Sequence, residues 1–341
     1  MKIVGDIMDI KNYVGHPLQT RGVEQYTLQN GKGNGMQFAF IRNGLGLEMW
    51  ISTDRCADVS RVSLNGKNIA FFSPCGYVAP SYYDNVGLGF LKSFTAGFIT
   101  TCGFGNVGQP CCDEGVNLPL HGTIGNLPAE LRSIEETEDG VTVKFALRDA
   151  VIFGFKYELI RTYFVSYKEN TFTMEDNVQN IGDIEAPFMW LYHCNFGYPL
   201  LTENSELKVP YDKMWADSGE AKKHIDTALL MEEPQTAFVE RCYFFDMTAN
   251  DDVCKSGIYN KDIDLGFVMK FKKSELPCFT EWKMMGKTDY VLGLEPGNIH
   301  PCGRANARSK GILQFLQPDE KYKASLEFNF VTDKSDFDKE F

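Results

Sequence analysis

The sequence lacks any run of about 20 consecutive apolar residues, the length that a helix needs to cross a bilayer. Its apolar stretches are short, and the one at 87–91 ends at Lys92 and Ser93. It also lacks a positively charged, apolar N-terminal segment, which is typical of secreted proteins. We therefore expect a cytoplasmic protein that has no membrane partner.

The sequence has no excess of basic residues. There are 34 Lys and Arg against 46 Asp and Glu, which gives a formal net charge of −12 and a pI near 5.0. Non-specific nucleic-acid binding needs a basic surface that displaces counterions from phosphates, so we expect no nucleic-acid partner. No glycine-rich phosphate loop of the GxGxxG or GxxxxGK[ST] type opens a predicted helix, which disfavours a nucleotide-binding α/β fold.

The ten cysteines lack the regular spacing of a small disulfide scaffold, and this favours a reducing compartment. Four of them lie near two histidines in the sequence and could form a soft-metal site: Cys102, Cys111, Cys112 and Cys194. Their spacing suits zinc poorly, because structural zinc sites present paired ligands such as CxxC. We expect free thiols that pack as small apolar groups, with no metal and no cofactor.

No internal repeat, low-complexity tract or linker rich in Pro, Gly and Ser divides the chain. We therefore expect one domain over residues 1–341, in which 333–341 form a solvated tail. Ample material for a large core is present, because the sequence contains 26 Phe and 15 Tyr.

Segments of strand length with alternating polarity recur along the chain, at 36–41, 47–51, 141–147 and 157–165. Short polar turns join such segments, as at 138–140 and 167–171, which is typical of antiparallel strands. Helices are expected only around 83–91 and 218–226. The sequence therefore predicts a mainly β protein, built as a large antiparallel β-sandwich.

Two histidines and one glutamate stand in distinctive motifs. His121 lies in Leu-His-Gly at 120–122, His193 in Leu-Tyr-His-Cys-Asn-Phe-Gly at 191–197, and Glu295 in Gly-Leu-Glu-Pro-Gly-Asn at 293–298. An imidazole transfers protons near neutral pH and a carboxylate complements it, so the three could move protons on a substrate without a cofactor. The structural alternatives are half-buried strand histidines and a glutamate before a Pro-Gly turn.

In their order, these motifs resemble the His, His and Glu motifs of the galactose mutarotase (aldose 1-epimerase) superfamily. Four further segments are similar to a less characterised aldose 1-epimerase-like branch: Ser-Pro-Cys-Gly-Tyr-Val at 73–78, Gly-Phe-Leu-Lys-Ser-Phe at 89–94, Thr-Thr-Cys-Gly at 100–103 and Asn-Leu-Pro-Ala-Glu at 126–130. The resemblance spans roughly residues 50 to 330. It implies a β-supersandwich with a cleft for a small-molecule carbohydrate.

The resemblance also implies a mechanism. To interconvert anomers, an enzyme removes the proton of the anomeric hydroxyl and protonates the ring oxygen, after which the ring opens and closes on the other face. Glu295 would be the base and His193 the acid. His121 would bind the substrate on the ring-oxygen side or assist proton transfer, and neither a metal nor a nucleotide is needed.

Two segments typical of mutarotases have no clear equivalent here: Gly-Arg-x-x-Asn-Arg-Ile before the first histidine and Asn-His-Ser-Tyr-Phe around the second. The substrate is therefore open, including whether it carries a phosphate or a sulfonate. The predicted substrate contacts are Arg55, Asp58, Lys92, Thr101, Asn195, Glu281, Trp282 and Asn298. Arg55 could bind an anion or form a surface salt bridge, and Trp282 could stack on a pyranose or pack in the core.

The predicted function is a cofactor-independent carbohydrate epimerase, most simply an aldose 1-epimerase, or mutarotase. The same acid and base could also serve aldose–ketose isomerisation or epimerisation at carbon 2. A non-catalytic sugar-binding module is the alternative from another class of protein.

Overall fold

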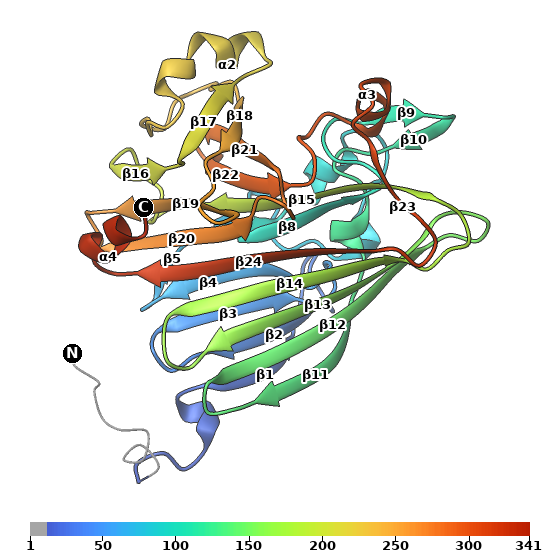
Figure 1. The fold of residues 1–341 in the computed structure, drawn as a ribbon. Coiled ribbons are helices and arrows are strands. Elements are labelled where there is room, and N and C mark those ends of the chain that lie inside the picture. Colours follow the sequence, from blue (N-terminus) through green and yellow to red (C-terminus); the bar gives the residue numbers. More distant parts are fainter. Residues whose placement is uncertain (1–11) are drawn as a thin grey trace.

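The computed structural model describes residues 12–341, and antiparallel β-sheets dominate this part of the chain (Figure 1). The eight-stranded sheet contains, in spatial order, β11 (Glu130–Glu136), β12 (Gly140–Ala150), β13 (Lys156–Ser166), β14 (Thr171–Asn180), β24 (Lys321–Val331), β20 (Leu265–Lys272), β19 (Val253–Asn260) and β16 (Ser205–Lys208). The seven-stranded sheet contains β17 (Tyr211–Trp215), β18 (Arg241–Met247), β21 (Cys278–Met285), β22 (Tyr290–Gly297), β15 (Ala186–Phe196) and β23 (Gln314–Leu316), and β8 (Ile99–Phe104) pairs with β15.

The N-terminal part forms a five-stranded sheet of β1 (Gly22–Thr27), β2 (Gln37–Arg42), β3 (Leu47–Ser52), β4 (Asp58–Leu64) and β5 (Lys67–Asn68). Two small sheets pair β6 (Phe71–Phe72) with β7 (Ala96–Gly97), and β9 (Cys111–Asp113) with β10 (Val116–Leu118). In the described part of the chain the helices are α2 (Gly219–Lys223), α3 (Arg304–Ser309) and α4 (Lys334–Lys339), with 3-10 turns η1 (Pro17–Gln19), η2 (Pro80–Tyr82), η3 (Gly89–Lys92), η4 (Ile124–Asn126) and η5 (Ile225–Thr227).

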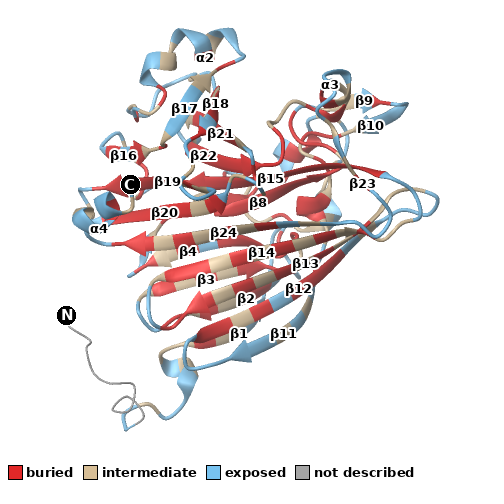
Figure 2. Cartoon of the chain, viewed as in Figure 1, coloured by how far each residue is buried: buried red, intermediate tan, exposed pale blue. Residues whose placement is uncertain are grey.

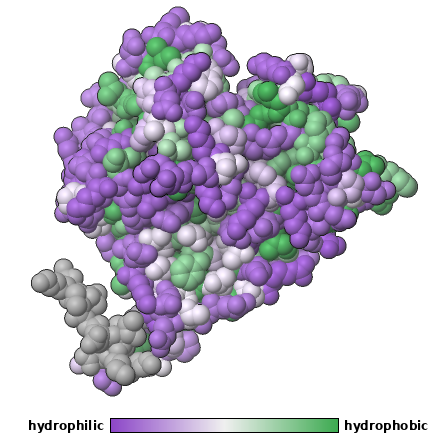
Figure 3. Space-filling view, in the orientation of Figure 1, coloured by the Kyte–Doolittle hydropathy of each residue, from purple (hydrophilic) through white to green (hydrophobic). Residues whose placement is uncertain are grey.

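The helices are few and short. Within residues 12–341, none is long and apolar enough to cross a membrane. The face of the molecule seen in Figure 3 is mainly hydrophilic, in keeping with the formal net charge of −12.

The predicted antiparallel β-sandwich is confirmed, and the four predicted strands appear as β2, β3, β12 and β13 with small shifts at their ends. Alternation identified them because only one face of each contacts the core, as Figure 2 shows for β13 and β14. The two expected helices are shorter than predicted. The first is reduced to η3, because Gly87 adopts a left-handed φ of 55° that breaks a helix, and the second to α2, which Ser218 caps.

Strand β15 is buried along its whole length, whereas most strands bury only one face (Figure 2). Its residues alternate between two environments. Trp190 and Tyr192 belong to the main core, which the three large sheets share, while Met189 and Leu191 belong to a second cluster on the opposite side of the strand. His193 follows on that opposite side, because successive side chains of a strand point to opposite faces.

The C-terminal segment, predicted to be a solvated tail, is largely exposed, but it is anchored at two points. Residues 334–339 form α4, and the fully buried ring of Phe337 lies 5.5 Å from the ring of Tyr259. Glu340 pairs with Lys255 and Lys270 at 3.2 and 3.1 Å. The high charge of this segment suggested solvation, yet one aromatic side chain and one carboxylate fix it against the eight-stranded sheet.

Candidate active site

The register of two neighbouring strands places His193 directly opposite Glu295. On β15 and β22, Leu191 pairs with Gly297 and Cys194 with Leu294, so the residues between them face each other across the strands. Residues in such a cross-strand pair share one face of the sheet. Nε2 of His193 lies 3.1 Å from Oε1 of Glu295, and both side chains are buried.

Gly293 leaves the space that the Glu295 carboxylate occupies. In the ladder it lies opposite Trp282 of β21. A Cβ atom at position 293 would come within 2.8 Å of Oε1 of Glu295, closer than real Cβ contacts, and within 3.1 Å of the Trp282 side chain, closer than most. Packing therefore explains the glycine at this position, which lies two residues before Glu295 on the same face of β22.

His121 reaches the same site from a loop. Its backbone has a left-handed φ of 57°, and Gly122 follows at 72°. A Cβ at Gly122 would lie 2.2 Å from the carbonyl oxygen of Gly103, so only glycine fits there. The amide of Gly108 donates to Nδ1 of His121 at 3.4 Å, which leaves the N–H of the neutral ring at Nε2. The ring centroids of His121 and His193 are 5.5 Å apart.

These three residues line a pocket of about 310 Å³. The rings of Phe94 and Trp282 each lie 5.2 Å from the ring of His193. The complete lining is Leu88, Phe90, Leu91, Phe94, Gly108, Gln109, Leu120, His121, His193, Glu240, Cys242, Trp282, Glu295 and Pro301. Apolar walls with a few converging polar groups are typical of sites for small molecules.

Burial determines the protonation of the site. It lowers the pKa of His193 to about 3, with a further contribution from His121, and lowers the pKa of His121 to about 4. Burial, together with the carboxylate of Glu240, raises the pKa of Glu295 well above its ordinary range. At neutral pH both imidazoles are therefore neutral, and burial favours the protonated carboxyl of Glu295, so the site favours a His193–Glu295 pair that holds one transferable proton.

The contact between His193 and Glu295 is close without being an aligned hydrogen bond. Among the described residues, Nδ1 of His193 and Oε1 of Glu295 have no hydrogen-bond partner. Buried polar atoms without partners are costly and are found mainly where a ligand or a reaction uses them. The pair therefore has hydrogen-bonding capacity left for a polar ligand.

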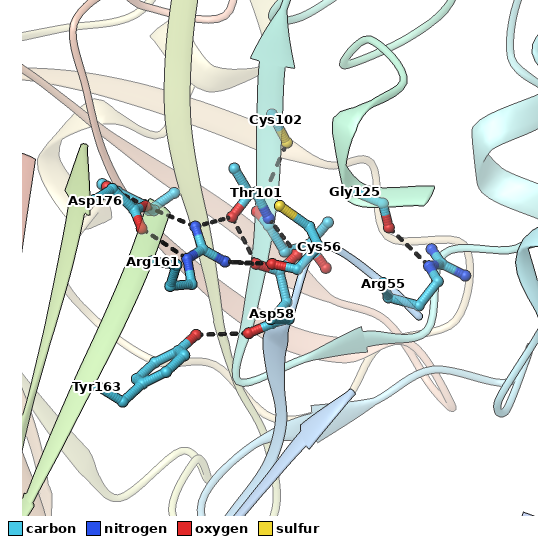
Figure 4. Close-up of polar contacts among 12 residues, drawn as sticks. Arg55, Cys56, Asp58, Thr101, Cys102, Gly125, Arg161, Tyr163 and Asp176 are labelled. Atoms are coloured by element: carbon cyan, nitrogen blue, oxygen red, sulfur yellow. Dashed lines mark hydrogen bonds and ion pairs between the residues drawn. The ribbon is translucent and has the colours of Figure 1, made fainter. Parts of the chain in front are cut away.

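Asp58 and Thr101, two of the predicted substrate contacts, lie in a buried ion network instead of the pocket (Figure 4). Asp58 accepts from the main-chain amide and hydroxyl of Thr101, at 2.8 and 2.6 Å, and pairs with Arg161 at 2.5 Å. Arg161 also donates two hydrogen bonds, at 2.8 and 2.7 Å, to Asp176, which accepts another from Tyr192 at 2.7 Å. The network joins strands of three sheets, so its role is to hold them together.

Arg55 is not available to an anionic substrate. It is buried, and its guanidinium donates to the carbonyl oxygen of Gly125 at 2.8 Å (Figure 4) and to those of Val78 and Ser93 at 2.9 and 3.1 Å. The sequence suggested an anion contact or a surface salt bridge, but the side chain braces three loops. Lys92 is 73% exposed and pairs with Asp84 at 2.6 Å, next to the pocket residue Leu91.

The two asparagines that were predicted to contact substrate form hydrogen bonds with the main chain. Asn298 accepts from the main-chain amide of Trp190 at 2.7 Å and donates to Gln314 at 2.9 Å. Asn195 is fully buried and donates to the carbonyl oxygen of His193 at 2.8 Å. Neither lines the pocket.

The carboxylate beside Trp282 comes from a residue that sequence reasoning missed. Glu281 precedes Trp282 in the chain, but strand alternation turns it to the opposite face of β21, where it is fully buried and its pKa is raised to about 8 by burial. Glu240, next to the start of β18, accepts from Nε1 of Trp282 at 2.8 Å. Nothing in the sequence shows that β18 and β21 are neighbours, so no signal pointed to Glu240.

The cysteines form no recognisable metal site. Cys102 and Cys194 are buried, and burial raises the pKa of both thiols, while Cys111 is half-buried and Cys112 exposed. All ten cysteines are free. Residues 12–341 contain no group of three or more His, Cys, Asp or Glu side chains placed to hold a metal ion.

Solved structures with the same fold carry sugar-related names. A "putative aldose 1-epimerase" from Klebsiella pneumoniae subsp. pneumoniae MGH 78578 superposes with a TM-score of 0.86 at 24% identity, covering 92% of this chain and 84% of that one. A galactose mutarotase-like protein from Clostridium acetobutylicum gives 0.67 at 15% identity, covering 92% and 100%. Galactose 1-epimerase from Lactobacillus acidophilus NCFM gives 0.62 at 13% identity, covering 91% and 98%.

These likenesses show a galactose mutarotase-like fold, as the sequence motifs implied. No curated protein matches the sequence. A family model described as "Domain of unknown function (DUF4432)" matches residues 33–330, which is most of the chain. This protein therefore belongs to the DUF4432 family and has a galactose mutarotase-like fold.

Proposed function

We propose that this protein is a cofactor-independent carbohydrate epimerase, an aldose 1-epimerase that interconverts sugar anomers. The observation that carries the proposal is the pair His193 and Glu295, 3.1 Å apart on adjacent strands in the wall of an aromatic-sided pocket. Anomerisation needs one proton removed and one donated at two oxygens bonded to the same carbon. A close acid–base pair that holds one proton fits this requirement.

The reaction begins when the sugar supplies hydrogen bonds that the pair lacks. A hydroxyl that donates to Glu295 stabilises its ionised form, and the displaced proton moves to His193. Glu295 then takes the proton of the anomeric hydroxyl while His193 protonates the ring oxygen. The bond between the ring oxygen and the anomeric carbon breaks, the resulting aldehyde rotates, and the reverse transfers close the ring on its other face.

The other pocket residues position the sugar. His121 presents its Nε2–H near His193 and can donate to an oxygen of the substrate. Phe94 and Trp282 both contact the His193 ring, and their own ring centroids lie 6.4 Å apart, so together they exclude water and offer apolar surface to a sugar face. The shared fold with proteins named for aldose 1-epimerase activity supports the same reaction.

The proposal is tested with anomerically pure aldoses. We expect the protein to accelerate the approach to anomeric equilibrium, followed by polarimetry, without exchange of carbon-bound hydrogen in deuterated water, followed by NMR. Deuterium at carbon 2 would instead identify an isomerase or a carbon-2 epimerase, because an enediol intermediate exchanges that proton. Binding of sugars without acceleration would identify a sugar-binding module.

The pH dependence of the proposed reaction follows from the protonation of the His193–Glu295 pair. Activity requires one proton on the pair, so it falls when His193 gains a second proton, near its pKa of about 3, and when the pair loses its proton above the ordinary range of a carboxyl. We expect kcat/KM, measured by polarimetry and corrected for the uncatalysed rate, to stay level as the pH is lowered from 7 to about 5, because both histidines gain a proton only below that range. A fall in activity around pH 6.5, the pKa of an ordinary histidine, would contradict this protonation scheme.

A further inference from the structure

We infer that Glu240 selects substrates by charge: its carboxylate fixes Trp282 against His193 and disfavours sugars that carry an anionic group. The inference rests on the proposed function, because it refines the same pocket. It addresses the question that the sequence left open, namely whether a phosphate or sulfonate belongs on the substrate.

The position of Trp282 depends on Glu240. Oε2 of Glu240 accepts the indole N–H at 2.8 Å, and the planes of the Trp282 and His193 rings meet at 72° with centroids 5.2 Å apart. The indole has a single donor, and this bond uses it. Trp282 therefore offers apolar surface to a ligand, while Glu240 places an acceptor and a negative charge at the edge of the pocket.

The pocket lining offers no fixed positive charge to an anion. Over residues 12–341, the lining contains the carboxyls of Glu240 and Glu295 and no Lys or Arg. Burial keeps both lining histidines neutral in the free site, and a proton that moves from Glu295 to His193 leaves that pair without net positive charge. Lys92 pairs with Asp84, and Arg304 pairs with Asp113 at 2.7 Å. A phosphate or sulfonate would thus meet the charge of Glu240 without a compensating cation, whereas neutral hydroxyls can donate to it.

Two substitutions separate the roles of Glu240. Glu240→Gln keeps an oxygen that can accept from the Trp282 indole but removes the charge. Glu240→Lys reverses the charge and loses the acceptor. Glu233→Lys is the matched control, because Glu233 is an exposed glutamate nearby in the chain that does not line the pocket.

The first measurement is the ratio of kcat/KM for an aldose 6-phosphate to kcat/KM for the same unmodified aldose. We expect Glu240→Gln to raise this ratio about threefold and Glu240→Lys about tenfold, mainly through the KM of the phosphate, because one or two charges change near the ligand. The effect should weaken at high salt. A ratio that moves no more than in Glu233→Lys would overturn the inference.

The second measurement needs no turnover. The fluorescence of Trp282, taken as the difference between each protein and its Trp282→Phe counterpart, is quenched with iodide and with neutral acrylamide. We expect Glu240→Lys to raise the iodide quenching constant about threefold while acrylamide quenching changes much less. If Glu240→Lys produces this shift in quenching but the wild-type protein accelerates no anomer exchange, the proposed function is refuted, while the inference that Glu240 selects ligands by charge stands. If the protein is active but neither the kcat/KM ratio nor the iodide quenching constant changes in the Glu240 variants, only the inference about charge is refuted.

Discussion

Replacement of Glu295 by Gln is expected to slow anomer exchange by about 100- to 10,000-fold, the range typical of losing a general acid or base. Glutamine has nearly the same shape and fits the space beside Gly293, so the pocket is retained. It cannot accept the proton of an anomeric hydroxyl, which explains the size of the loss. The rate is measured by polarimetry or exchange NMR on a neutral aldose that the wild-type protein equilibrates.

The matched control is Glu281→Gln, the same substitution at another fully buried carboxyl on the neighbouring strand. Glu281 faces away from the pocket, so its replacement should leave the rate within about twofold of wild type. His193→Ala should be as slow as Glu295→Gln, and the double variant scarcely slower than either, because the two residues act as one unit. Full activity in Glu295→Gln would refute the assignment of Glu295 as the base, and full activity in His193→Ala would refute the assignment of His193 as the acid.

Replacement of Arg161 by Met is expected to lower the free energy of unfolding by about 3 to 5 kcal/mol. Arg161 is fully buried and pairs with both Asp58 and Asp176, so its loss leaves two buried carboxylates without their cation. Unpaired buried charges cost far more than the ion pairs gain. The free energy of unfolding is measured from urea transitions at pH 7.

Arg148→Met controls for the loss of an arginine from the same sheet. Arg148 pairs with Glu158 at 2.8 Å, but its side chain is 67% exposed, so we expect a change below about 1 kcal/mol. If Arg161→Met does not fold, Tyr192→Phe removes a single hydrogen bond to Asp176 and should cost about 1 to 3 kcal/mol. Loss of less than 1 kcal/mol in both variants would show that the network contributes little to stability.

The features that the sequence predicted well depend on local patterns. The alternation of β12 and β13 identified both strands because each buries one face only. His121, His193 and Glu295 stood out as candidates because their motifs carry local requirements as well as chemistry. Gly122 allows a turn at His121, and Gly293 makes room for Glu295.

The features that the sequence missed depend on which strands are neighbours. Arg161 and Glu240 have no distinctive local context, and their roles appear only when β13 meets β4 and when β18 meets β21. The same reason explains why Asp58 and Thr101 were predicted to contact substrate. A polar residue near a motif in the chain can be oriented towards a different face of the sheet. Long-range pairing is the information that a single sequence lacks.

The candidate site has one part on paired strands and one part on connecting segments, and the two parts differ in how much sequence change they tolerate. His193 and Glu295 stand on paired strands, and their spacing is set by a main-chain ladder that other side chains do not alter. The walls around them come mostly from connecting segments that contribute Phe90, Gln109, His121 and Pro301. Connecting segments tolerate insertion and replacement far better than ladders do. Exchange of loops would therefore reshape the walls of the pocket, while the sheet keeps His193 and Glu295 at the same spacing.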